Sequence, residues 1–90
     1  MHKFVDNDKG YLDWVASFPG GYVVNIERSL NPNNVILHKA TCWTITGKPA
    51  RGEAWTDAYI KICSTSMEEL ESWITIEVGG EVRKCKLCNP

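Results

Sequence analysis

Apolar residues near the start of the chain recur at helical spacing. Tyr11, Leu12, Val15 and Phe18 follow the pattern of one helical face, and Pro19-Gly20-Gly21 comes directly after them. Such spacing gathers apolar side chains on one side of a helix, and a Pro-Gly run ends the helix. We therefore expect a helix over residues 8–18 that packs one face against a sheet.

Two β-rich runs follow, and turn residues separate them. Residues 22–26 and 35–38 are rich in Val and Ile, and Asn31-Pro32-Asn33-Asn34 lies just before the second run. Valine and isoleucine favour strands, while Asn-Pro sequences favour turns, so this segment predicts a β-hairpin. Beyond it, residues 41–46 predict a short strand or bend, and the polar residues 47–56 predict a surface loop.

A third strand is predicted over residues 58–63, where the two faces differ in character. Ile60 and Ile62 occupy one face, and the other face carries Tyr59, Lys61 and Cys63. Successive side chains of a strand point to opposite faces, so the isoleucines are expected to enter a core. The three strands together predict a small antiparallel sheet.

The second helix has the clearest start signal in the chain. Ser66-Met67-Glu68-Glu69 matches a capping box, and Gly79-Gly80 ends the segment. One face of this helix carries Met67, Leu70, Trp73 and Ile74. The remaining residues, 81–90, are too few for another helix and suit a metal-binding turn. The expected fold class is α+β, with a small antiparallel sheet, two helices and a C-terminal zinc-binding turn.

Size and composition indicate one domain that benefits from an additional cross-link. The chain has 90 residues, of which 43% are hydrophobic, and a core of this size often needs a metal or disulfides. Its net charge of -1 excludes strong overall attraction to nucleic acid or to anionic membranes. No apolar run resembles a signal peptide or a membrane span, so we expect a cytoplasmic protein without a membrane partner.

The cysteine pattern predicts a metal site. In a reducing compartment, the four cysteines favour metal binding over disulfides, although a secreted chain would allow three disulfide pairings. Cys85 and Cys88 form a C-x-x-C step, which supplies half of a tetrahedral zinc site. His38 and Cys42, four positions apart beside a turn, supply the other half. Three thiolates and one imidazole leave no coordination position open, which predicts a structural Zn²⁺ rather than a catalytic one.

Cys63 and His2 are the other residues that could act as metal ligands. Cys63 is the rival fourth ligand that can replace His38, although a free cysteine on a strand is more often a small buried hydrophobe. His2 lies in a terminus expected to be frayed and carries little weight as a ligand.

The ligand pattern resembles a known family. His38-x-x-x-Cys42, then a strand, a helix that begins at a serine, a glycine pair, and residues 82–90 up to Cys85-Lys86-Leu87-Cys88-Asn89-Pro90 are similar to the zinc-binding domain of the Ada DNA-repair proteins. The resemblance covers about the second half of the chain. It also extends to small related modules appended to nucleases.

The resemblance implies the ligands His38, Cys42, Cys85 and Cys88, and leaves Cys63 out. From the chain length we expect a single domain over 1–90, in which residues 36–90 are the Ada-like zinc portion and residues 1–35, without a counterpart in the family, are a helix-plus-hairpin extension. The resemblance further implies an accessory role in a nuclease or repair system. The family's methyl-accepting position is a cysteine, but this chain has His38 there, so methyl transfer by the family route is not expected.

A nucleic-acid-binding function, with DNA as the expected ligand, follows from the resemblance and from local basic residues. Phosphate contacts are expected from Arg83, Lys84, Lys86, Lys39 and Arg51, with Trp43 stacking on a base. Lys48 and Lys61 would extend this surface, and Trp55 or Tyr59 would offer further stacking. The alternative is that these lysines are simply solvated and the aromatic residues belong to the core.

Two other classes of function compete with nucleic-acid binding. Glu68, Glu69 and Glu71 form an acidic helix face that suits a protein-interaction or inhibitory module whose zinc is purely structural. An enzyme is the weakest class, because a zinc deaminase needs a carboxylate in an H-x-E step, whereas Lys39-Ala40 follows His38. Only methyl acceptance by a zinc thiolate such as Cys42 is left as an enzyme-like activity.

Overall fold

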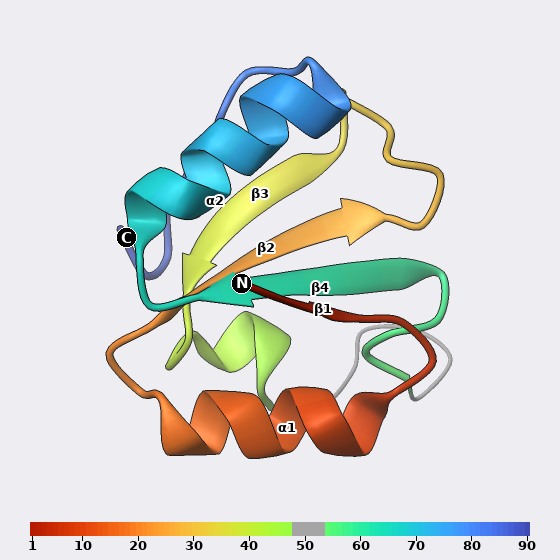
Figure 1. Ribbon diagram of the computed structural model, residues 1–90. Helices are drawn as coiled ribbons and strands as arrows, with labels where there is room; N and C mark the ends of the chain where they lie inside the picture. Colours follow the sequence, from red (N-terminus) through yellow and green to blue (C-terminus); the bar gives the residue numbers. More distant parts are fainter. Residues whose placement is uncertain (48–53) are drawn as a thin grey trace.

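The computed structural model describes residues 1–47 and 54–90, which form an antiparallel sheet with helices on both sides (Figure 1). The strands in these residues are β1 (His2–Phe4), β2 (Tyr22–Glu27), β3 (Val35–Lys39) and β4 (Tyr59–Ser64), in the order β1-β4-β2-β3. The helical elements are α1 (Asp8–Ser17), α2 (Met67–Trp73), the 3₁₀ turn η1 (Trp43–Ile45) and the π-helical turn η2 (Ile74–Val78). The predicted α+β class is confirmed. No helix in these two stretches is long and apolar enough to cross a membrane.

Helix α1 begins and ends close to the predicted positions, but its buried face differs from the expected one. The Asn7 side chain caps the helix by accepting a hydrogen bond from the Gly10 amide at 2.9 Å. The buried side chains are Tyr11, Trp14 and Val15, whereas Leu12 and Phe18 are exposed. Periodicity alone therefore placed the apolar face of this helix slightly off its true position.

The predicted hairpin and third strand are present, and β1 is an additional strand. In the register of the sheet, Val24 of β2 lies opposite Leu37 of β3 and Ile62 of β4. β1 pairs with β4, so His2 lies in a strand and the expectation of a frayed terminus was wrong. Residues 41–46, expected as a strand or bend, contain the 3₁₀ turn η1.

Helix α2 follows the predicted start and stop signals. The Ser66 hydroxyl accepts a hydrogen bond from the Glu69 amide at 3.3 Å, which is the N-cap half of a capping box, while the Ser66 amide donates to the Ser64 hydroxyl. The helix continues through η2 and ends at Gly79, whose φ of 79° is in the left-handed region that glycine adopts without strain. Gly80 then passes so close to the hairpin turn that a Cβ atom there would lie 2.9 Å from the Pro32 carbonyl oxygen.

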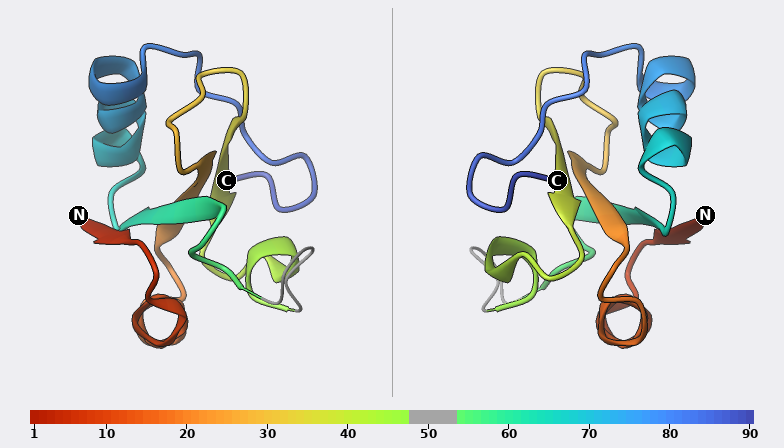
Figure 2. Two further views of the ribbon diagram at one scale, coloured as in Figure 1. Left: turned by 90° about the vertical axis from the view of Figure 1, so that its right-hand side faces the viewer. Right: turned by 90° about the vertical axis from the view of Figure 1, so that its left-hand side faces the viewer.

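The sheet is buried on both faces, which gives the domain two hydrophobic cores (Figure 2). The core beneath α2 consists of Val24, Ile26, Val35, Leu37, Ile60, Ile62, Leu70 and Ile74. The core beneath α1 consists of Tyr11, Trp14, Val15, Val23, Ala40, Cys42, Ile45, Trp55, Cys63 and Cys85. Three of the cysteines thus belong to the α1 core, so this core reaches the predicted metal ligands.

Lys61 and Trp55 are buried, contrary to the expectation that they face a nucleic acid. Lys61 is 2% exposed, and its Nζ donates a hydrogen bond to the Trp55 carbonyl at 2.5 Å. The ammonium also lies 5.7 Å from the ring centre of Tyr11 and 5.9 Å from that of Trp55, distances at which aromatic rings attract a cation. The segment 55–56 is held by Asp8, which accepts hydrogen bonds from the amides of Trp55 and Thr56.

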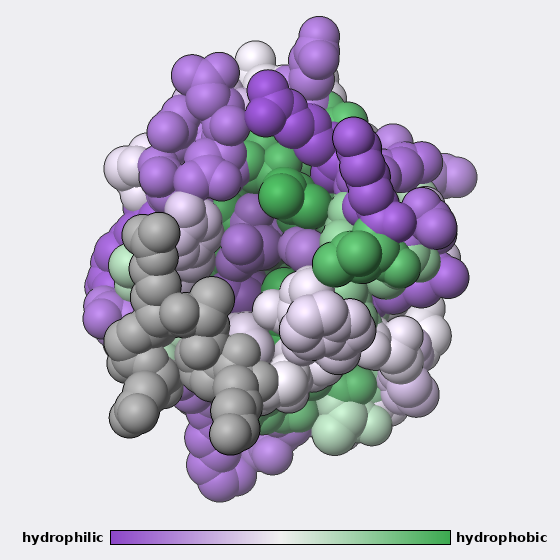
Figure 3. Space-filling view, turned by 180° about the vertical axis from the view of Figure 1, so that it is seen from behind, coloured by the Kyte–Doolittle hydropathy of each residue, from purple (hydrophilic) through white to green (hydrophobic). Residues whose placement is uncertain are grey.

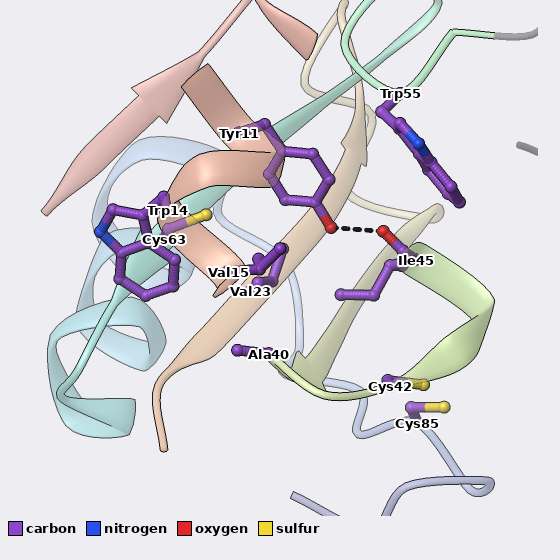
Figure 4. Packing of buried hydrophobic residues seen from close by; sticks show 10 residues of the cluster. All are labelled: Tyr11, Trp14, Val15, Val23, Ala40, Cys42, Ile45, Trp55, Cys63 and Cys85. Carbon is purple, nitrogen blue, oxygen red and sulfur yellow. Dashed lines mark hydrogen bonds between the residues drawn. The ribbon is translucent and has the colours of Figure 1, made fainter. Parts of the chain in front are cut away.

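Tyr11→Phe should destabilise the domain, because Tyr11 links α1 to η1. Its buried hydroxyl donates a hydrogen bond to the Ile45 carbonyl at 2.6 Å (Figure 4). Removal of the hydroxyl leaves that carbonyl unsatisfied, at a cost of about 1–3 kcal/mol in the free energy of unfolding, measured by urea denaturation. Tyr22→Phe is the matched control, with a change below about 0.5 kcal/mol. Equal midpoints for the two variants would contradict this role of Tyr11.

Candidate metal centre

Four side chains from distant parts of the chain converge at one side of β3. The metal-binding atoms of His38, Cys42, Cys85 and Cys88 all lie within 4.8 Å of one another. The first two residues come from β3 and the turn after it, and the last two come from the C-terminal segment. Figure 2 shows this segment and η1 together on the side of the sheet away from α2.

His38 is held by the sheet and has an imidazole nitrogen free for a ligand. In the sheet register, His38 pairs with Val23, and only 5% of the residue is exposed. Its Nδ1 atom is buried and has no hydrogen-bond partner among the described residues. Burial, together with the nearby charge of Lys61, lowers the pKa of His38 to about 4. The imidazole is therefore neutral at neutral pH, the form that binds metals.

Cys42 is fixed by the tight turn that joins β3 to η1. Its amide donates a hydrogen bond to the Lys39 carbonyl at 3.0 Å, and its carbonyl accepts one from the Ile45 amide at 3.2 Å. The Cys42 Sγ atom also lies 2.9 Å from the Thr44 hydroxyl oxygen, within hydrogen-bond distance. In Figure 4 the sulfur atoms of Cys42 and Cys85 lie next to each other and point the same way.

The C-terminal segment is attached to β3 by backbone hydrogen bonds. The Leu37 amide donates to the Arg83 carbonyl at 2.8 Å, and the Cys85 amide donates to the Leu37 carbonyl at 2.9 Å. These bonds form a short parallel bridge between Leu37 and Lys84. Because His38 follows Leu37 and Cys85 follows Lys84 along the chain, the bridge places Cys85 close to His38. Cys88 follows in a turn closed by a 3.0 Å hydrogen bond from the Asn89 amide to the Cys85 carbonyl.

The two thiols of the C-x-x-C turn have different environments. Burial raises the pKa of Cys85, but the amides of Cys88 and Leu87 and the neighbouring thiols more than offset it, so the pKa is lowered. Burial raises the pKa of Cys88 to about 11, although its sulfur accepts a hydrogen bond from the Lys39 amide at 3.3 Å. Such amide bonds to sulfur are typical of turns that stabilise metal-bound thiolates.

The cluster fits a tetrahedral metal ion. Bonds of about 2.0–2.3 Å to nitrogen and sulfur place the donor atoms of a tetrahedral site about 3.5–3.8 Å apart. The donor atoms here are within 4.8 Å of one another, so small side-chain rotations suffice to reach this spacing. A buried imidazole nitrogen without a hydrogen-bond partner is also accounted for by a metal ligand. His38, Cys42, Cys85 and Cys88 can therefore hold a metal ion together.

The rival ligands lie outside this cluster. Cys63 is fully buried on β4 within the α1 core. Among the residues that the structure describes, it belongs to no group of side chains that could hold a metal. Burial raises the pKa of its thiol to about 12, so it is protonated at neutral pH. His2 is exposed on β1. Cys63 therefore occupies a buried hydrophobic position, which is the role that the sequence offered as the alternative to metal binding.

Five of the predicted nucleic-acid contacts, namely Lys39, Trp43, Arg83, Lys84 and Lys86, lie within two sequence positions of a metal ligand. Lys39, Lys84 and Lys86 are exposed, and each is adjacent in sequence to a member of the cluster. Arg83 is also exposed, and its guanidinium donates a hydrogen bond to the Asn33 carbonyl at 3.2 Å. Trp43 follows Cys42 and is 71% exposed. Arg51 and Lys48 lie outside the described residues.

Comparison with known proteins leaves the resemblance to the Ada zinc domain as a prediction. No family model, no curated protein and no solved structure matches this chain.

Proposed function

We propose that the protein is a non-catalytic nucleic-acid-binding module whose fold is stabilised by one structural Zn²⁺. Zinc is favoured over other metals because three thiolates and one imidazole form the tetrahedral, soft-ligand set typical of structural zinc sites. Four protein ligands fill the coordination sphere, which supports a structural role over catalysis.

The main support for nucleic-acid binding is that the segments holding the metal ligands also contain exposed lysines. Lys39, Lys84 and Lys86 are each one position from a ligand, so a bound metal fixes their backbones relative to one another. None of the three forms an ion pair with a carboxylate among residues 1–47 and 54–90. Their charge is therefore available for phosphates, although the chain as a whole is slightly acidic.

An exposed aromatic ring beside these cations supports contact with an unpaired base. Trp43 is 71% exposed and Leu87 is 68% exposed, and each is adjacent in sequence to a metal ligand. Figure 3 shows hydrophobic side chains open to solvent between hydrophilic ones on the back of the molecule. Proteins that bind single strands combine such rings with a positive surface, and stacking contributes about 1–3 kcal/mol per base.

The proposal is tested by measuring zinc content and nucleic-acid binding on the same preparation. We expect one zinc per chain by elemental analysis, and binding to single-stranded or duplex DNA that weakens steeply between about 50 and 200 mM salt. Fluorescence anisotropy of a labelled oligonucleotide reports the affinity. A preparation without zinc would contradict the metal assignment, and zinc without DNA binding would contradict the nucleic-acid assignment.

In that second outcome, a protein-interaction role becomes the better explanation. Glu68 and Glu69 are exposed on α2, and Ile76 beyond them is 76% exposed. A carboxylate face next to an apolar side chain suits a basic protein partner. Binding of DNA independent of salt concentration would support neither function, because phosphate contacts always release counterions.

A further inference from the structure

A pocket of about 420 Å³ opens on the α1 side of the sheet, separate from the metal ligands. Its volume is within the range of roughly 300–1,000 Å³ typical of small-molecule sites. The pocket lies between the middle of β2 and β4 and the segments that carry η1 and Trp55. Its lining includes Asn25, Thr44, Ile45, Trp55, Tyr59 and Lys61.

The buried Lys61 ammonium has hydrogen-bonding capacity that the protein does not use. An ammonium has three N–H donors, and the Trp55 carbonyl is the acceptor for one of them. Among the described residues, the Lys61 ammonium makes no other hydrogen bond and no ion pair within 4.0 Å. Buried polar groups are normally satisfied, so a ligand oxygen in the pocket would accept a hydrogen bond from one of the two remaining donors.

Asn25 places an unused carboxamide beside this lysine. The two residues pair in the β2–β4 register, so their side chains lie next to each other on the same face of the sheet. Asn25 is half-buried, and its side chain has no hydrogen-bond partner among the described residues. A carboxamide offers a donor and an acceptor side by side, the complement of a ring edge that carries C=O and N–H or N groups.

The charge and the walls of the pocket favour a neutral, planar ligand over an anion. The carboxylate of Asp8 already acts electrostatically on Lys61, and it is held nearby by the Trp55 and Thr56 amides. An anionic ligand would leave this buried region with excess negative charge, whereas a neutral carbonyl would not. Trp55 and Tyr59 supply flat surfaces, and Ile45 supplies an apolar one.

We propose that this pocket binds a nucleobase that carries a ring carbonyl, with Lys61 donating to the carbonyl and Asn25 pairing with the neighbouring edge of the base. The inference rests on the proposed function only for the source of the base, a nucleotide extruded from a bound strand. A nucleoside in solution tests the pocket by itself, because it needs no contact with the basic residues around the metal centre.

The test is a titration of the zinc-loaded, ¹⁵N-labelled chain with deoxynucleosides, followed by NMR. Thymidine and deoxycytidine, which have a ring carbonyl, should shift the side-chain amide signals of Asn25 saturably. Deoxyadenosine, which has none, should bind at least several-fold more weakly. Deoxyribose 5-phosphate controls for the sugar and phosphate, and equal shifts with this probe would overturn the proposal in favour of a phosphate site.

Substitutions separate the pocket from the rest of the surface. Asn25→Ala should weaken thymidine binding about tenfold, the discrimination expected from a paired base contact. Asn33→Ala, in the exposed hairpin turn, is the matched control and should bind thymidine like the wild type. Lys61→Met should remove the preference for thymidine over deoxyadenosine. If Lys61→Met does not fold, the Asn25 and Asn33 pair still decides, since the Asn25 side chain makes no hydrogen bond to residues 1–47 or 54–90.

Failure of the pocket and failure of the proposed function give different results. Salt-dependent binding of an oligonucleotide, without any nucleoside shift at Asn25, would reject the pocket and leave the proposed function standing. Saturable thymidine binding without oligonucleotide binding would support the pocket and reject the proposed function.

Discussion

Cys85→Ser is expected to lose stoichiometric zinc and cooperative unfolding together. Cys85 is buried, and its amide donates a hydrogen bond to the Leu37 carbonyl in the bridge between the C-terminal segment and β3. Its loss removes a thiolate ligand and leaves the other donors buried without an ion. Elemental analysis and thermal unfolding followed by circular dichroism measure the two effects on one sample.

The expected size of this effect follows from the scale of zinc binding. Structural zinc contributes about 10–16 kcal/mol of apparent free energy in small domains, and a domain's total stability is about 5–15 kcal/mol. The metal-free chain is therefore expected to lose most of its tertiary structure. A chelator added to the wild-type protein should reproduce the behaviour of Cys85→Ser.

Cys63→Ala is the matched control for this variant, because it also removes a buried thiol. Cys63 lies in the α1 core outside the donor cluster, so the variant should keep one zinc and lose only about 1 kcal/mol from a small cavity. His38→Ala should behave like Cys85→Ser. Retention of zinc by both His38→Ala and Cys85→Ser would overturn the assignment of the four ligands.

Replacement of Arg83, Lys84 and Lys86 by alanine is expected to weaken DNA binding and to flatten its salt dependence. Each phosphate contact contributes about -0.9 to the slope of log K against log salt on duplex DNA, so three contacts contribute roughly -2.7. These residues are exposed, and none is a metal ligand, so the variant should bind zinc and unfold like the wild type. Titrations at several salt concentrations give the slope.

Lys3→Ala/Lys9→Ala controls for the loss of positive charge as such. Both lysines are exposed, and they lie on β1 and α1 rather than in the ligand turns. Their removal should leave the slope within experimental error of the wild-type value. An unchanged slope in the triple variant would show that Arg83, Lys84 and Lys86 do not contact phosphate.

Much of the fold was predictable because its signals are local. The Ser66 cap, the Gly79 stop and the Asn-Pro turn act within a few residues, so the sequence specifies them without tertiary context. β1 escaped prediction because a three-residue strand has too short a pattern and exists only by pairing with β4. The buried position of Trp14, which is only 7% exposed, was missed because the predicted apolar face was defined by Tyr11, Leu12, Val15 and Phe18.

Lys61 shows where sequence pattern failed for a physical reason. Lysine is rarely buried, so its alternation with Ile60 and Ile62 indicated a solvent-facing side of β4. In the fold, α1 and the segment around Trp55 cover that side, and the ammonium is stabilised by two aromatic rings and a carbonyl. The lowering of its pKa to about 8, chiefly by burial, is a consequence of contacts that no local pattern encodes.

The metal-ligand set was predictable for the opposite reason. The C-x-x-C step and the four-residue spacing of His38 and Cys42 each fit two ligands to one ion, so ligand chemistry links segments that are distant in sequence. The position of Lys61 and the pocket beside Asn25 have no such spacing rule. They arise from the register of β2 against β4 and became visible only in the folded chain.

The bridge between Leu37 and Lys84 also has a consequence for solubility. β3 is the last strand of the sheet, and the C-terminal segment forms hydrogen bonds with the outer backbone groups of Leu37 and with the Lys39 amide. If the metal were lost, that segment would detach and leave an open edge strand containing Val35, Ile36 and Leu37. Exposed apolar edges pair readily with other chains, so a bound metal would protect the protein against aggregation as well as against unfolding.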